Sequence, residues 1–148
     1  MRAAGDAGVL FSNSSSGNVL RGNVILANGC SSVLVAGGGT NAGNTVAENC
    51  LRNALNALDD EAGAANAFDD GVPGNFWGSL AADGTGYSEA CTDRRLGAAP
   101  LNDDICDAHP VEPFPYGVPG VGGSSDRFPL QQCVDFASPV NVSMRIEK

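Results

Sequence analysis

The feature that most constrains the fold is a short Gly-Asn or Ala-Asn pattern that recurs along the first half of the chain. Three segments align on it, at residues 22–28, 43–49 and 65–70. Their asparagines, Asn23, Asn44 and Asn66, follow one another at a nearly constant spacing. Short apolar runs at residues 9–11, 33–35 and 55–57 keep a similar step. A repeat of roughly 22 residues indicates a β-solenoid, because helical repeats need about 34 residues or more.

Equivalent residues of successive coils in a parallel β-solenoid stack about 4.8 Å apart. We therefore predict that Asn23, Asn44 and Asn66 form a structural ladder of side-chain amides at one corner, where asparagine tolerates a left-handed backbone. Three apolar residues are predicted to form an inward stack: Ile25, Val46 and Phe68. The alternative is an antiparallel sandwich in which the Gly-Asn pairs are hairpin turns. Hairpins do not require a constant period, whereas a solenoid does.

The repeat resembles the coils of right-handed parallel β-helix proteins of the pectate-lyase-like superfamily. Residues 66–78 (NAFDDGVPGNFWG) resemble the last-coil signature of NosD-like β-helix proteins, and residues 125–130 (SDRFPL) resemble that family's closing Asp-Arg-Tyr-Pro-Leu. The resemblance covers roughly residues 8–130. It implies an all-β fold, a right-handed parallel β-helix of about three coils with a long irregular C-terminal capping segment.

The chain also departs from that family. NosD-like proteins have many more coils, and the soft ligands expected where members are linked to copper are scarce here. The sequence holds two methionines, Met1 and Met144, and one histidine, His109. Copper binding is therefore not carried over, and a metal-handling accessory protein is a third interpretation supported by family association alone.

Three regions are predicted: parallel β-helix coils at 1–78, a Gly/Pro/Asp-rich capping region at 79–130, and a tail at 131–148 with one strand at 140–146. The C-terminal cap is assigned five apolar residues: Phe76, Trp77, Tyr116, Phe128 and Leu130. Three coils have a height of only about 14 Å, and a solenoid needs covered ends. We therefore expect further N-terminal coils or a partner chain over the first coil.

Five cysteines predict disulfides in an oxidising compartment, because none forms a Cys-x-x-Cys pair. Cys91 and Cys106 are the first-choice pair, Cys30 and Cys50 are further candidates, and an odd count leaves one thiol over. The N-terminus lacks the apolar core of a signal peptide. Because this absence conflicts with the disulfide prediction, we expect an extracellular or periplasmic location as part of a longer exported protein. A lone cytosolic protein with reduced thiols is the alternative.

Paired carboxylates are the most enzyme-like feature. Asp59, Asp60, Asp69 and Asp70 are weak catalytic candidates, since polysaccharide-cleaving β-helix enzymes use carboxylate clusters and glycosidic hydrolysis needs two carboxyl groups. The competing interpretation is that they are ordinary turn residues beside glycine. No cofactor is predicted other than calcium, which takes six to eight oxygen ligands. Its weak candidates are Asp83, Asp93, Asp103, Asp104 and Asp107, and their spacing does not match known calcium loops.

The charge excludes some partners. A net charge of −9, with eight basic residues against 17 acidic ones, argues against nucleic acid, whose phosphates require basic clusters. No apolar run reaches the length of roughly 18 residues that a membrane-spanning helix needs. The leading hypothesis is a non-enzymatic exported β-helix scaffold that binds a polysaccharide or a protein partner. The alternative is a polysaccharide lyase or hydrolase whose active site lies mainly on coils absent from this chain.

Overall fold

The computed structural model describes residues 7–63, 65–71, 73–81, 85–91, 105–106 and 115–133. The secondary structure within these ranges is almost entirely short β-strands, with one four-residue helix, α1 (Tyr87–Ala90). No helix in them is long and apolar enough to cross a membrane. The eight strands before the helix are β1 (Ala7–Phe11), β2 (Val19–Arg21), β3 (Val24–Leu26), β4 (Ser31–Val35), β5 (Thr45–Ala47), β6 (Cys50–Arg52), β7 (Ala57–Asp59) and β8 (Phe76–Gly78).

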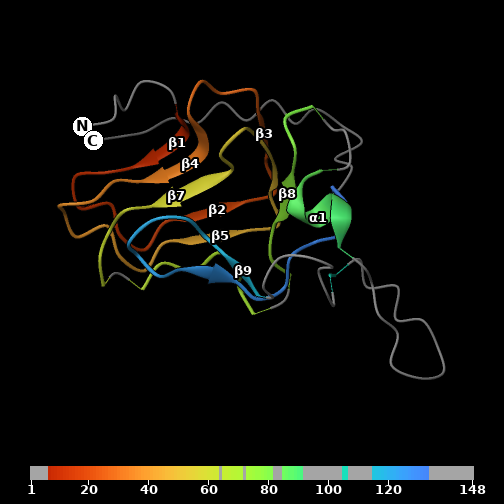
Figure 1. The fold of residues 1–148 in the computed structure, drawn as a ribbon. Coiled ribbons are helices and arrows are strands. Elements are labelled where there is room, and N and C mark those ends of the chain that lie inside the picture. The colour runs from red at the N-terminus through yellow and green to blue at the C-terminus, as the bar shows by residue number, and fades with distance from the viewer. Residues whose placement is uncertain are drawn as a thin grey trace.

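These eight strands form three parallel sheets, ordered β1-β4-β7, β2-β5 and β3-β6-β8 (Figure 1). The chain visits the sheets in a fixed order and then returns to the first, so each passage, here called a circuit, lies against the one before it. The third circuit meets the β2-β5 sheet through a bridge between Thr45 and Ala67. The sequence-derived alternative, an antiparallel sandwich, is wrong for this region because all the described pairings among β1 to β8 are parallel. The structure thus has coils stacked in the manner of a β-helix.

The C-terminal residues add a small antiparallel pair, β9 (Tyr116–Gly117) and β10 (Ser125–Asp126). In Figure 1 the strand β9 lies below β5, at the third-circuit end of the stack. The helix α1 packs beside β8, where Glu89 forms an ion pair with Arg52 of β6. We call residues 115–133 the return segment, since they come back onto the circuits after the region around α1.

The register corrects the predicted period. In the first sheet, Val33 pairs with Val9 on one side and with Ala57 on the other. The predicted step from run 9–11 to run 33–35 is therefore confirmed. The step from run 33–35 to run 55–57 is wrong, because residues 57–59 pair with 33–35 instead. The third sheet has a longer step than the sequence suggested, since Cys50 pairs with Val24 and with Phe76.

The predicted ladder of Asn23, Asn44 and Asn66 is wrong at its first rung, because Asn23 stacks on Asn49, at a sequence separation of 26. Each of the first two circuits has two Asn corners five residues apart, and the sequence alignment joined the second corner of one to the first corner of the next. The alignment therefore made the first step five residues too short. The inward stack of Ile25, Val46 and Phe68 is wrong at its first step for the same reason, since Ile25 is in register with Leu51 of β6. Its second step is supported, because Val46 and Phe68 directly follow the bridged residues Thr45 and Ala67 and are buried in the same core.

The corner backbone differs from the expectation as well. In the first two circuits the residue before the ladder asparagine, rather than the asparagine itself, has a left-handed backbone: Gly17, Gly22, Gly43 and Glu48 have φ between 56° and 70°. Ala27 has φ of 56° and precedes Asn28, whose N–H donates to Oδ1 of Asn53 at the next corner. Glycine adopts this conformation without the steric cost that a Cβ atom brings. This local requirement accounts for the Gly-Asn pairs at residues 17–18, 22–23 and 43–44.

The interior is a stack of apolar side chains that becomes aromatic toward the third circuit. Val46, Leu51 and Phe68 are buried there with Trp77. The ring of Tyr116, from the return segment, lies over Trp77 with 4.4 Å between ring centroids, and Tyr87 of α1 meets Tyr116 edge-on. These rings close the third-circuit end of the interior.

Two disulfides occur in the described part of the chain. Cys91 is bonded to Cys106, the first-choice pair from the sequence, and Cys50 of β6 is bonded to Cys133 of the return segment. Cys30 is a free thiol, so its candidacy for a disulfide is wrong. Such bonds indicate folding in an oxidising, exported environment. The predicted strand at 140–146 lies outside the described residues.

The left-handed corners make a prediction about single residues. Ala27 is exposed and has φ of 56°, so Ala27→Gly should raise the free energy of unfolding by about 1 kcal/mol by removing the steric penalty on its Cβ. Gly22→Ala, at the equivalent place one corner earlier, should lower it by a similar amount. Urea unfolding of both variants checks this, and changes of the same sign would contradict it.

Candidate functional site

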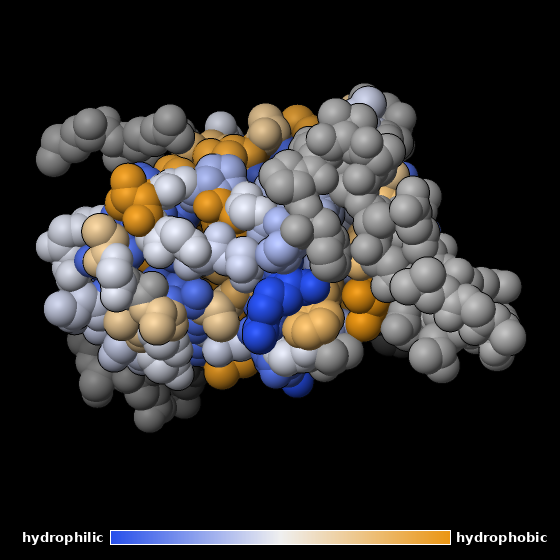
Figure 2. Space-filling view, turned by 60° about the horizontal axis from the view of Figure 1, so that its bottom comes forward, coloured by the Kyte–Doolittle hydropathy of each residue, from blue (hydrophilic) through white to orange (hydrophobic). Residues whose placement is uncertain are grey.

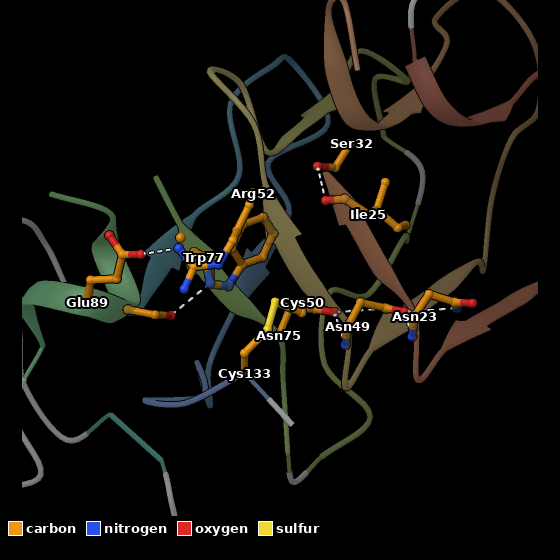
Figure 3. Close-up of a disulfide and its surroundings, with 12 residues drawn as sticks. Asn23, Ile25, Ser32, Asn49, Cys50, Arg52, Asn75, Trp77, Glu89 and Cys133 are labelled. Atoms are coloured by element: carbon orange, nitrogen blue, oxygen red, sulfur yellow. Dashed lines mark hydrogen bonds and ion pairs between the residues drawn. A yellow bond between two sulfur atoms is a disulfide. The ribbon is translucent and has the colours of Figure 1, made fainter. Parts of the chain in front are cut away.

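Two asparagine ladders run through the circuits at the corners that flank β2 and β5. In the first ladder the backbone N–H of Asn23 and its side-chain amide both donate to Oδ1 of Asn49, at 3.0 and 3.1 Å. Asn49 donates in the same two ways to Oδ1 of Asn75, at 3.1 and 3.0 Å. Figure 3 shows these three side chains in a row beside the Cys50–Cys133 disulfide. The amides also satisfy backbone carbonyls, since Nδ2 of Asn49 donates to the oxygens of Leu20 and Ala47.

The second ladder repeats this geometry with Asn18, Asn44 and Asn66. Asn18 donates through its backbone and its side chain to Oδ1 of Asn44, and Asn44 donates likewise to Oδ1 of Asn66. The predicted stacking of Asn44 on Asn66 is therefore confirmed. Asn44, Asn49, Asn66 and Asn75 are all buried, so their carboxamides act in place of the strand pairing that a corner lacks.

Both ladders have the same direction: every rung donates to the next rung along the chain. The first-circuit carboxamide oxygens therefore accept nothing from a preceding rung in the described residues, and the last rung needs an acceptor beyond itself. In the ladder that ends at Asn75, that acceptor comes from the return segment.

Asp126 is the acceptor that ends the first ladder. Its Oδ2 accepts the backbone N–H of Asn75 at 2.7 Å and the indole N–H of Trp77 at 2.8 Å, and its Oδ1 accepts the N–H of Phe128 at 3.0 Å. A Cβ atom on Gly74 would collide with this carboxylate, so only glycine fits there. Burial raises the pKa of Asp126 to about 7, against these hydrogen bonds, which lower it.

Two of the weak catalytic candidates also hold the return segment. Asp69 forms a two-pronged pair with Arg127, with Nη2 to Oδ1 at 2.6 Å and Nε to Oδ2 at 3.1 Å. Burial acts to raise the pKa of Asp69, but the hydrogen bonds from Arg127 and Gly71 outweigh it and lower the pKa. Asp59 is fully buried and accepts the hydroxyl of Ser124. The backbone N–H and C=O of Asp59 also pair with the turn at residues 119–122.

The other two candidates lie apart from this cluster of bonds. Asp70 forms an ion pair with Arg21, and Asp60 is half-buried, with its backbone N–H donated to Val35. Asp59 and Asp69 are therefore engaged in holding the chain together. The arrangement supplies hydrogen-bond acceptors to backbone and side-chain donors of neighbouring segments.

No group of three or more His, Cys, Asp or Glu residues that could hold a metal ion occurs in the part of the chain that the structure describes. The calcium candidates Asp83, Asp93, Asp103, Asp104 and Asp107 all lie outside the described residues. No cofactor site is assigned on the described part of the chain.

Sequence reasoning missed the residues that matter most at this site: Asn18, Asn49, Asn75 and Asp126. A signal for the asparagines was present, because Asn18 and Asn23 share the five-residue spacing of Asn44 and Asn49. The signal for Asp126 was the closing motif at residues 125–130, which marked the residue without indicating its role.

No family model, curated protein or solved structure matches this chain. The resemblance to NosD-like β-helix proteins therefore stays a prediction made from the sequence.

The ladder predicts a large difference between a buried rung and an exposed one. Asn49→Ala leaves the carbonyls of Leu20 and Ala47 and two N–H groups of Asn23 without their partner, so the free energy of unfolding should fall by about 3 kcal/mol or more. Asn18→Ala removes an exposed side chain and should lower the free energy of unfolding by about 1 kcal/mol. Urea unfolding measures both. Equal losses of unfolding free energy in the two variants would contradict the conclusion that the buried ladder asparagines stabilise the corners.

The pKa of Asp126 predicts a pH dependence of stability. Its folded pKa of about 7 lies above the ordinary aspartate value of about 3.9, so between these pH values the folded chain keeps a proton that the unfolded chain releases. The stability of the wild type should therefore fall as pH rises from 4 to 7, by at most about 1.4 kcal/mol per pH unit. Asp126→Asn cannot ionise, so it should lack this component. Unfolding curves at several pH values test this, and parallel profiles for the two proteins would refute it.

Proposed function

We propose that this chain is a non-enzymatic scaffold of the right-handed parallel β-helix class, with a C-terminal end of the NosD-like kind. The observation that carries the proposal is the use of Asp59, Asp69 and Asp126 as buried acceptors that join the third circuit to the return segment. A general acid and base for glycoside cleavage must both reach the sugar. These carboxylates face neighbouring segments of the chain instead.

The regular circuits support the scaffold part of the proposal. Parallel strands held in a fixed register present outward side chains at regular intervals along each sheet. A rigid array of this kind suits a repetitive or extended partner, either a polysaccharide or a protein segment. Specificity for the partner would come from the fixed positions of these side chains, without a conformational change.

The proposed location is the cell surface or the periplasm. The Cys50–Cys133 bond joins β6 to the return segment across a sequence separation of 83, and bonds of this type persist in oxidising compartments. A protein with a net charge of −9 also stays soluble and resists self-association there.

Binding to a glycan without cleaving it is the expected behaviour of such a scaffold. In affinity gels containing neutral or acidic polysaccharides, the chain should be retarded by a neutral polymer, since its negative charge repels acidic ones. No new reducing ends or unsaturated sugars should form. Release of such products, lost in Asp59→Asn or Asp60→Asn, would establish the lyase or hydrolase alternative. Retardation by no polymer would leave a protein segment as the partner of the scaffold.

A further inference from the structure

The first circuit ends in open strand edges. The strands β1, β2 and β3 are each the outermost strand of their sheet, and each has one neighbour in the described structure, namely β4, β5 and β6. The backbone N–H and C=O groups on their far sides thus have no strand partner in those ranges, which makes them a template for strand addition. We call the edges of β2 and β3, with the corners at Asn18 and Asn23, the open end.

The open end offers acceptors in a fixed arrangement. Oδ1 of Asn44 and of Asn49 each accepts a backbone N–H and a side-chain amide from the preceding circuit. The equivalent oxygens of Asn18 and Asn23 accept nothing from the described residues. A ligand that fits must therefore bring N–H donors, and it must bring two sets of them spaced as Asn18 and Asn23 are.

Apolar side chains border the same edges. Val19 is 68% exposed, Val24 50% and Leu26 53%, and Figure 2 shows apolar residues standing among polar ones on the molecular surface. Val24 lies in register with Cys50 and Phe76, which are buried beneath Leu130 of the return segment. The outer face of this sheet is thus covered over its second and third circuits and left open over its first.

A second copy of the chain does not meet these requirements. If two open ends met, the carboxamide oxygens of Asn18 and Asn23 in one copy would face the same acceptor oxygens in the other, and neither copy would supply donors. The third-circuit end is closed, because Asp126 already accepts from Asn75 and the ring of Tyr116 covers Trp77. The polarity of the ladders therefore excludes a second copy as the occupant of the open end.

We propose that the open end binds an extended segment of a partner polypeptide as an added parallel circuit. The segment carries two asparagines five residues apart, each preceded by a glycine, with apolar residues between and after them. Its backbone and side-chain amides donate to Oδ1 of Asn18 and Asn23, and its apolar residues cover Val19, Val24 and Leu26. This inference rests on the parallel circuits of the proposed scaffold and names the partner that the scaffold takes.

The probe is a fluorescently labelled synthetic peptide with the sequence of residues 16–28, which contains both Gly-Asn pairs. Fluorescence anisotropy during titration with the full chain should show saturable binding. The same peptide carrying Asn18→Asp and Asn23→Asp lacks the side-chain donors and opposes carboxylates to the acceptors. Its affinity should be at least about tenfold lower, a change of about 1.4 kcal/mol.

The chain offers matched controls at its other end. Leu80 is 53% exposed, as Leu26 is, and Val121 is 68% exposed, as Val19 is. Leu26→Lys and Val19→Lys place charges on the open edges and should each weaken peptide binding several-fold. Leu80→Lys and Val121→Lys should leave it unchanged. Equal effects of the two sets, or equal affinity of the two peptides, would overturn the proposal.

Amide hydrogen exchange separates this proposal from the scaffold itself. Protected N–H groups at Asn44 and Asn49 report intact circuits, since both N–H groups donate along the ladders. Protection without saturable peptide binding refutes the partner inference alone, whereas free exchange at both positions refutes the circuits as well. A dimer in sedimentation that Leu26→Lys abolishes would also refute it, because the ladders exclude pairing of two open ends.

Discussion

The structure depends on one interaction, the hydrogen bonds that a buried asparagine carboxamide makes at the corners between strands. A corner cannot continue the strand ladder, yet its backbone N–H and C=O groups still need partners when they are buried. Asn49 supplies them, since its Oδ1 takes two donors of Asn23 while its Nδ2 reaches the carbonyls of Leu20 and Ala47. Removing water from the corner strengthens these bonds and makes any omission costly. The circuits can therefore stack in only one register.

The direction of these bonds gives the stack two different ends. Because each rung donates forward along the chain, the last rung must meet an acceptor and the first rung presents one. The return segment meets the first need with Asp126, which also accepts the Trp77 indole, and the Cys50–Cys133 bond fixes that segment to the second circuit. At the other end, Asn18 and Asn23 keep their oxygens available among exposed apolar residues. Polarity of the ladder thus links the fold to the proposed binding behaviour.

The acidic character of the chain has a structural use that its composition hides. Asp59, Asp69 and Asp126 are buried and each accepts hydrogen bonds from the return segment or the third circuit. A carboxyl group can accept hydrogen bonds through both of its oxygens. Aspartates suit the third-circuit end of the ladders, because every asparagine in the ladders donates toward that end. The same placement removes them from the surface where a substrate would lie.

The sequence alone determined that the chain forms short parallel strands with asparagine at the corners, because the Gly-Asn spacing is local and recurs. It also indicated the Cys91–Cys106 pair, which lies close along the chain. The register and the Cys50–Cys133 bond were decided only by the tertiary structure. In the sequence, the spacing from Asn23 to Asn44, which lie at different corners, resembles the spacing between equivalent corners. Packing of the interior, in which Ile25 is in register with Leu51, decides which corners stack. The role of Asp126 depends on Asn75, which is distant along the chain, so it emerges only when the return segment packs onto the last circuit.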